Sequence, residues 1–336
     1  MSGAPHEDGA LVLYQHPPAW GLPTTCPRCL AAHALLRWGG LGSFQTDSGG
    51  NSAVSPTASL PALEDGEAFV GSFEGVRHHL RETRGRDLDA WLGDGARAQL
   101  AAFNALTEAQ LCTATESALW LDQDNYQAVT KPVFVAAHAW FIGWRMADRR
   151  RHAARTARPA GATDESLLAR GSEALQALSS QLKGPYLFGE QPTSLDATLL
   201  GQLLVHLYCP LPHHPLRDVI AELPNLVAFA RRGAAECFGE LPEPIVDGAN
   251  GTAGAGNSAK GPRERPAKRT YTPAEQAFHE TSRWYMIGIA VATTAFSVLS
   301  WQFTQDHYDF IQDQIATQLE TQIDRLAEEA AEEDEE

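Results

Sequence analysis

Short apolar runs separated by turn residues occupy the first part of the chain. Residues 11–14 have the length and composition of a strand, and residues 26–38 carry apolar positions at helical spacing before a glycine pair. Two further short strands, 60–63 and 68–70, flank an acidic turn containing glycine that is typical of a hairpin, and a helix follows. This order predicts a thioredoxin-like domain over residues 11–83, preceded by a disordered N-terminus at residues 1–10.

Residues 84–238 show the three-to-four-residue apolar spacing of helices. Leu168, Leu175 and Leu178 are examples of this spacing. Thr193 and Asp196 precede a long apolar run and form an N-capping pattern, in which the hydroxyl accepts from a free backbone N–H and the carboxylate lies in the first turn. The pattern predicts an all-helical second domain, so that the two domains together form an α+β fold.

An uncharged hydrophobic run fills residues 284–303. Twenty residues of helix span about 30 Å, which matches the hydrocarbon core of a bilayer. Trp284, Tyr285 and Trp301 lie at its ends, where aromatic residues meet the membrane interface. Gly288 and Ala292 form a pair of small residues that would let this helix pack closely against a neighbour. The run predicts one C-terminal transmembrane helix that anchors the chain in the lipid bilayer.

The segments on either side of this run differ in charge. Residues 239–282 are rich in glycine, alanine and proline and become basic toward the span, which predicts a flexible basic linker. Residues 304–336 form an acidic amphipathic tail, either a solvated helix or a helix that binds a partner. Since basic residues favour the cytosolic side, the large domain is expected in the cytosol.

The charge and the cysteines narrow the possible functions. The net charge is -16, and the part after residue 305, with twelve acidic residues and one arginine, accounts for -11 of it. The remaining -5 gives no electrostatic reason to expect nucleic-acid binding. The N-terminus lacks the pattern of a secretory signal, and five scattered cysteines do not form a disulfide framework, which favours a reducing compartment.

One cysteine pair could carry chemistry. Cys26, Pro27 and Cys29 lie where a loop enters the first helix, and a helix N-terminus lowers the pKa of a thiol. Dithiol chemistry and a purely structural role both remain open for this pair. A metal site is not expected, because the chain offers no second pair of ligands at a recognised spacing. We therefore predict no metal and no cofactor.

A cluster of arginines lies in the second domain. Residues 145–160 contain six arginines and one acidic residue. The cluster is either a solvated helix end or a docking patch for an acidic partner surface, formed by Arg145, Arg149, Arg150, Arg151, Arg155 and Arg158.

The string SLPALEDGEAFVGSFEGVRHHL, residues 59–80, resembles the second half of the N-terminal domain of glutathione transferases. The resemblance implies that Pro61 is cis and faces the active-site loop. It also implies that Ser72 belongs to the site that grips the γ-glutamyl group of glutathione, while Gly71 replaces the acidic or amide residue usual there. The strings FGEQPTSLDATLL and LPNLVAFARR resemble helices of the C-terminal domain of the same family, so the resemblance implies a glutathione-transferase-like fold over residues 11–238.

The string WGLPTTCPRCL, residues 20–30, together with the linker and the C-terminal span, resembles the metaxins of plants and algae more narrowly. This resemblance implies a non-enzymatic subunit of the sorting and assembly machinery, which inserts β-barrel proteins into the mitochondrial outer membrane, and a contribution to mitochondrial protein import. It implies as partners the outer-membrane β-barrel assembly protein, a second metaxin-like subunit and β-barrel precursors. The large domain would face the cytosol and the acidic tail the intermembrane space.

Two alternatives stay open. The first is a membrane-anchored glutathione transferase or glutaredoxin-like thiol enzyme that uses Cys26 as nucleophile and Cys29 as resolving thiol. The second is a tail-anchored transferase-like protein that controls mitochondrial shape. The first rests on the two cysteines, and the second on the anchor alone.

Overall fold

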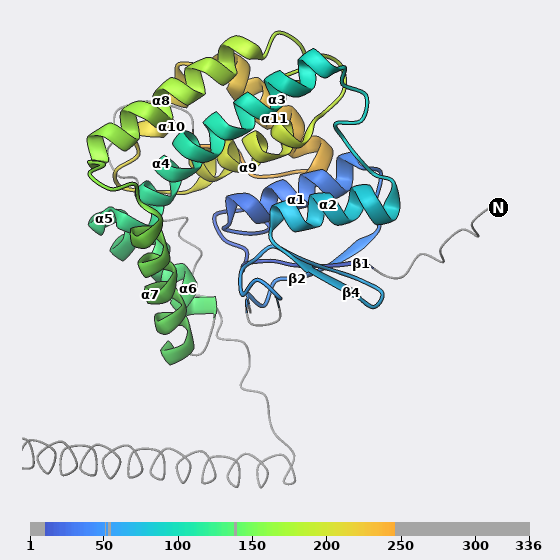
Figure 1. Ribbon diagram of the computed structural model, residues 1–336. Coiled ribbons are helices and arrows are strands. Elements are labelled where there is room, and N and C mark those ends of the chain that lie inside the picture. The colour runs from blue at the N-terminus through green and yellow to red at the C-terminus, as the bar shows by residue number, and fades with distance from the viewer. Residues whose placement is uncertain (1–10, 51, 53–54, 138–139, 246–336) are drawn as a thin grey trace, which may run out of the picture. The chain divides into compact units, whose positions relative to one another are not determined.

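The computed structural model describes residues 11–50, 52, 55–137 and 140–245, all of which belong to one compact unit (Figure 1). The predicted disordered N-terminus, most of the linker, the predicted transmembrane helix and the acidic tail lie outside the described residues. The same holds for the expected anchor residues Trp284, Tyr285, Gly288, Ala292 and Trp301. Within the described part of the chain, no helix has the length and apolar character needed to cross a bilayer.

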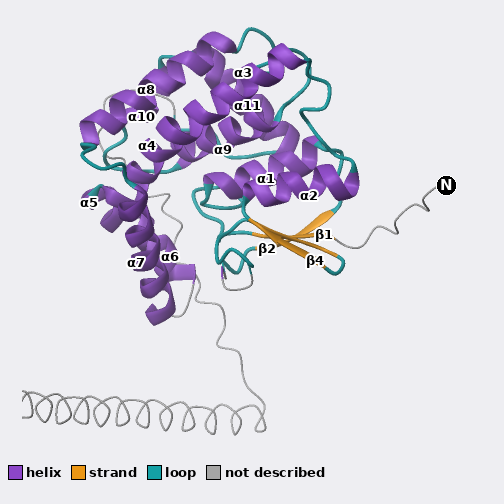
Figure 2. Ribbon diagram, viewed as in Figure 1, coloured by secondary structure: helices purple, strands orange, loops and turns teal. Residues whose placement is uncertain are grey.

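A four-stranded sheet lies at the N-terminal end of the unit (Figure 2). Its strands are β1 (Leu11–Tyr14), β2 (Phe44–Asp47), β3 (Ala62–Asp65) and β4 (Ala68–Gly71), in the order β2-β1-β3-β4. Strand β1 is parallel to β2 and antiparallel to β3, and β3 and β4 form the predicted hairpin. Helices α1 (Pro27–Trp38) and α2 (Phe73–Arg84) pack together along one face of this sheet (Figure 1). This is the thioredoxin-like arrangement that the sequence predicts.

The strands differ in detail from the sequence expectation. Strand β3 begins two residues later than predicted, after the cis peptide between Leu60 and Pro61. The sequence pattern does not predict strand β2, because its side chains, FQTD, are mostly exposed and show no apolar alternation. It forms because its backbone pairs with β1 at the edge of the sheet. Backbone pairing, and not side-chain burial, therefore determines this strand.

The second part of the chain is helical. A first run is nearly continuous from residue 94 to 121 and changes between α-helical and π-helical turns: α3 (Asp94–Leu106), η2 (Thr107–Cys112), α4 (Thr113–Glu116) and η3 (Ser117–Leu121). A second run follows, with α5 (Gln123–Asn125), η4 (Tyr126–Thr130) and α6 (Lys131–Ala137). The remaining helices are α7 (Trp140–Ala157), α8 (Asp164–Gln181), α9 (Ser194–Tyr208), α10 (Pro215–Ala221) and α11 (Pro224–Phe238).

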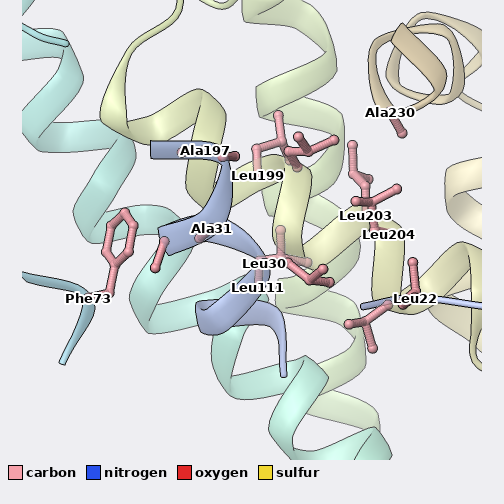
Figure 3. Packing of buried hydrophobic residues seen from close by; sticks show 14 of the residues in the cluster. Leu22, Leu30, Ala31, Phe73, Leu111, Ala197, Leu199, Leu203, Leu204 and Ala230 are labelled. Carbon is pink, nitrogen blue, oxygen red and sulfur yellow. The ribbon is translucent and has the colours of Figure 1, made fainter. Parts of the chain in front are cut away.

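Helix α9 forms the centre of the core, where it packs against α1 and α11 (Figure 3). Every one of its residues is buried. It begins with the predicted capping box, in which the hydroxyl of Thr193 accepts from the Asp196 N–H and the Asp196 carboxylate accepts from the Thr193 N–H at 2.8 Å. Gly201 allows α9 to approach α1 closely, since a Cβ at this position would lie 2.2 Å from the Pro27 carbonyl oxygen. The capped, buried α9 thus fixes the start of α1.

The beginning of the predicted linker is part of the folded unit. Ile245 donates its N–H to the carbonyl of Leu207 at 2.8 Å, and Leu241 packs on the main hydrophobic core. Pro242 lies against Gly21, where an added Cβ would be 2.3 Å from the proline ring. The expectation of a flexible linker from residue 239 is therefore wrong for residues 239–245, whose apolar side chains the glycine- and proline-rich composition concealed.

Candidate functional site: a buried cysteine pair beneath the helical domain

The CPRC segment lies at the N-terminus of α1, as predicted. Cys26 is the residue before the helix, with extended backbone angles, and Pro27 is its first residue. Proline suits this position because its missing N–H would have no partner inside the helix. Both thiols are reduced, and both are buried, with exposed fractions of 5% for Cys26 and 0% for Cys29. The structure thus places a dithiol at a helix N-terminus but closes it to solvent.

The surroundings favour a negative charge on one sulfur of the pair. The thiol of Cys29 donates to Cys26 and lowers its pKa, and the positive charge of Arg150 and the backbone N–H of Cys29 act in the same direction. Burial opposes this shift. The pKa of Cys29 is raised, because this thiol is buried and its proton is held by Cys26. If either sulfur ionises, it is therefore Cys26.

Cys26 is covered by His16 and by side chains from the helical domain, whereas Cys29 packs in a cluster with Leu60 and Ala62 of the first domain. Trp120 from η3 and Phe134 from α6 stack edge-to-face, with ring centroids 5.0 Å apart. Together with His16 and Arg150 they line a cavity of about 10 Å³ next to Cys26, which holds at most one water molecule. Trp120, Phe134 and Arg150 are far from the cysteines in the sequence, and no local motif marks them. Only the packing of the two domains reveals the cover.

Arg150 is the charged residue beneath this cover. Its guanidinium pairs with Glu116 at 2.9 Å and lies 5.8 Å from the centre of the Trp120 ring. The carboxylate next to it raises the pKa of Arg150, so this side chain stays charged. Arg150 therefore serves the fold through its ion pair with Glu116 and its contact with Trp120.

The residues that the transferase resemblance implied lie beside the cysteines. The Leu60–Pro61 peptide is cis, in agreement with the resemblance. Ser72, at φ 68°, precedes α2, and its hydroxyl accepts a hydrogen bond from the Gly75 N–H at 3.1 Å. Its hydroxyl oxygen is therefore engaged in capping α2. Phe73, the next residue, is buried in the core.

A larger cavity, of about 320 Å³, opens next to this region. Ser72 and Leu60 line one side, and residues of η2, α4 and α7 line the other. Two of its basic groups pair with carboxylates that also line the cavity: Arg28 with Glu108 at 2.6 Å, and Arg150 with Glu116 at 2.9 Å. The cavity thus lies between the two domains. The charges of Arg28 and Arg150 in its lining are each balanced by a carboxylate.

The predicted arginine patch separates into two groups. Arg151 lies 4.2 Å from the centre of the Tyr126 ring and donates to Gln123 at 2.7 Å. Arg158 pairs with Asp164 at 2.7 Å and closes the turn between α7 and α8. With Arg150, these two arginines serve the fold. Exposed side chains remain at three positions: Arg145, Arg149 and Arg155.

Of the other three cysteines, Cys112 lines the larger cavity, whereas Cys209 and Cys237 line neither of the two cavities described above. Cys112, Cys209 and Cys237 are buried, and burial raises the pKa of each thiol. Among the residues that the structure describes, no group of three or more histidine, cysteine or acidic side chains is placed to hold a metal ion.

Comparisons with known proteins agree with this architecture. Residues 29–151 match a family model described as outer mitochondrial membrane transport complex protein, and residues 171–233 match the C-terminal domain of glutathione S-transferases. A solved glutathione transferase from Phanerochaete chrysosporium superimposes with a TM-score of 0.50 at 15% identity, over 68% of this chain and 98% of that protein. At this identity the likeness concerns the fold alone.

The curated relatives are more specific. The metaxin-1 homologue of Caenorhabditis briggsae is 35% identical over 183 residues, which are 52% of this chain and 57% of that protein. The mitochondrial outer membrane import complex protein metaxin of Arabidopsis thaliana is 26% identical over 238 residues, 68% of this chain and 73% of that protein. The chain thus spans little more than half the length of the worm relative. Fold, motif and relatives agree, and the chain is similar to the metaxins.

Proposed function

We propose that this protein is a non-enzymatic subunit of the machinery that inserts β-barrel proteins into the mitochondrial outer membrane. Its folded unit would face the cytosol and contact the central β-barrel protein and a second metaxin-like subunit. The hydrophobic run at residues 284–303 would anchor it, and the acidic tail would lie in the intermembrane space. In this role the protein also contributes to protein import.

The observation that carries the proposal is the family match over residues 29–151. This range begins at Cys29, covers the hairpin and α2, and ends within α7, so it includes both sides of the candidate site. The Arabidopsis relative is named as an import complex protein. Its similarity covers 238 residues, a longer stretch than the family model. The matched description names a transport complex of the outer mitochondrial membrane, and the predicted anchor would place the folded unit at that membrane.

The geometry of the cysteine pair supports a role without catalysis. A thiol enzyme must present a sulfur to its substrate, whereas here both cysteines are buried, Cys26 beside Trp120 and Phe134 and Cys29 in a cluster with Leu60 and Ala62. The oxygen of Ser72, which the transferase resemblance assigned to glutathione, is engaged in capping α2. The acidic or amide residue expected before it is Gly71. Binding of a partner protein requires none of these groups.

The proposal is tested by depleting the protein and importing a labelled β-barrel precursor into the isolated mitochondria. We expect the precursor to accumulate before membrane insertion, while import of a matrix precursor is less affected. Re-expression of the wild-type chain, and of Cys26→Ser, should restore insertion equally. Normal insertion in depleted mitochondria would refute the proposal.

A thiol enzyme is the second candidate, and one observation favours it. The hydrogen bond from the Cys29 thiol, helped by the charge of Arg150, lowers the pKa of Cys26, as is usual for activated thiols. If this candidate is correct, the purified chain reduces a glutathione mixed disulfide, and Cys26→Ser abolishes the activity. Loss of biological function in Cys26→Ser, with normal folding, would favour this candidate over the assembly subunit.

A further inference from the structure

We propose that the exposed face of α7 binds the surface of an anionic lipid bilayer and thereby holds the folded unit against the membrane. The inference rests on the membrane anchor of the proposed function and adds a second point of contact. It starts from the arginine patch, which the structure reduces from six side chains to the three exposed ones.

The three remaining arginines share one face of α7. At about 100° per residue, Trp144, Arg155, His152, Arg145 and Arg149 lie in this order within an arc of about 140°. All five are exposed, whereas Ala147 and Ala154 on the opposite side are buried. Helix α7 therefore presents one continuous basic face to solvent along most of its length.

Trp144 gives this face its second property. Trp144 is 51% exposed, more than the other exposed large hydrophobic residues in the described part of the chain, Ile245 at 44% and Trp91 at 40%. Tryptophan next to arginine is the pair of side chains that prefers the headgroup region, where the ring is buried at the boundary and the guanidinium contacts phosphate.

The charge of the face fits an anionic surface. Asp148 is the one acidic residue in the arc, so the face carries a net positive charge while the chain as a whole is acidic. Each exposed arginine near an anionic bilayer strengthens binding about fivefold. Three arginines and one tryptophan bind weakly by themselves, but a tethered domain needs only weak binding, because the anchor keeps its local concentration high.

The site can be probed with one new cysteine. All five native cysteines are buried, so His152→Cys places a single reactive thiol in the middle of the face. Ala101→Cys, on the exposed side of α3 and far from α7 in Figure 1, is the matched control. Each variant of the full chain is labelled with a fluorophore and reconstituted into vesicles of phosphatidylcholine, with or without phosphatidylserine, that contain brominated acyl chains.

We expect the bromine to quench the probe at position 152, more in vesicles with phosphatidylserine, and to leave the probe at position 101 bright. Arg145→Gln and Arg149→Gln should each weaken this contact about fivefold. The exposed Arg170 of α8 offers a control, since Arg170→Gln should have no effect. Raised salt should weaken the contact as well.

Three results would overturn the inference. The first is equal, low quenching at both probe positions, and the second is quenching that depends neither on phosphatidylserine nor on the arginines. The third is a probe at position 152 that becomes shielded from solvent only when the β-barrel partner is added. The last would make α7 a protein-docking face. Flotation of the chain with the vesicles tests the anchor separately. Co-purification of the Arg145→Gln variant with the β-barrel protein tests the proposed function independently of lipid binding.

Discussion

Gly201 lies where the helical domain meets the cysteine-bearing helix, and Gly201→Ala tests that contact. The new Cβ would lie 2.2 Å from the Pro27 carbonyl oxygen and 3.1 Å from the backbone nitrogen of Ala31. Both neighbours are backbone atoms, so no side-chain rotation relieves the clash. Because a carbon and an oxygen need more than about 3 Å, α1 must move by about 1 Å relative to α9.

The energy follows from two opposing effects. Overpacking of this kind costs about 3 kcal/mol at the upper end of its usual range. Alanine improves the helix propensity of α9 by about 1 kcal/mol over glycine. The net loss in the free energy of unfolding is about 2 kcal/mol, which lowers the melting temperature of a unit of this size by roughly 4–8 °C.

The assay is thermal unfolding of the full chain in detergent, followed by circular dichroism. Gly95→Ala, in α3, is the control, because its Cβ would meet no atom within 4 Å, and it should leave the melting temperature unchanged or raise it. Since Pro27 lies within the CPRC segment, Gly201→Ala should also speed alkylation of Cys26. A melting temperature equal to that of Gly95→Ala would refute the close approach of α9 to α1.

Two electrostatic predictions follow. Asp65 is buried between Arg84 and His79, which lower its pKa to about 2, so its contribution to stability is present above pH 3.8 and is lost as the pH falls toward 2. At pH 7, Asp65→Asn should therefore cost about 2 kcal/mol of unfolding free energy in urea titrations, and this difference should close toward pH 2; a constant difference would contradict the assignment. Arg150→Gln removes a charge that lowers the pKa of Cys26, so the pH midpoint of Cys26 alkylation should rise, whereas Arg149→Gln, at the exposed neighbouring position, should not move it.

Much of the fold could be predicted from the sequence because its signals are local. The β1 strand, the hairpin and the capping box of α9 each depend on residues close together in the chain, and the structure contains all three. Strand β2 and the packing of residues 239–245 escaped prediction because both depend on pairing with distant segments.

The candidate site, too, could be predicted from the sequence only where it depends on residues close together in the chain. The position of Cys26 and Cys29 at a helix N-terminus follows from the motif, but their cover does not. Trp120 lies on a π-helical turn about ninety residues away, and Arg150 comes from a different helix. The sequence grouped Arg150 with the exposed arginines, since a run of like charges does not reveal which member turns inward to meet Glu116.

We propose that the protein works as part of an assembly in the mitochondrial outer membrane. The most direct test is to solubilise mitochondria in mild detergent, purify the full chain through an N-terminal tag, and identify what migrates with it on a native gel. We expect the central β-barrel insertase to migrate with the chain in stoichiometric amount, and Cys26→Ser to behave as the wild type does. A chain that migrates alone and is retained on immobilised glutathione would contradict it.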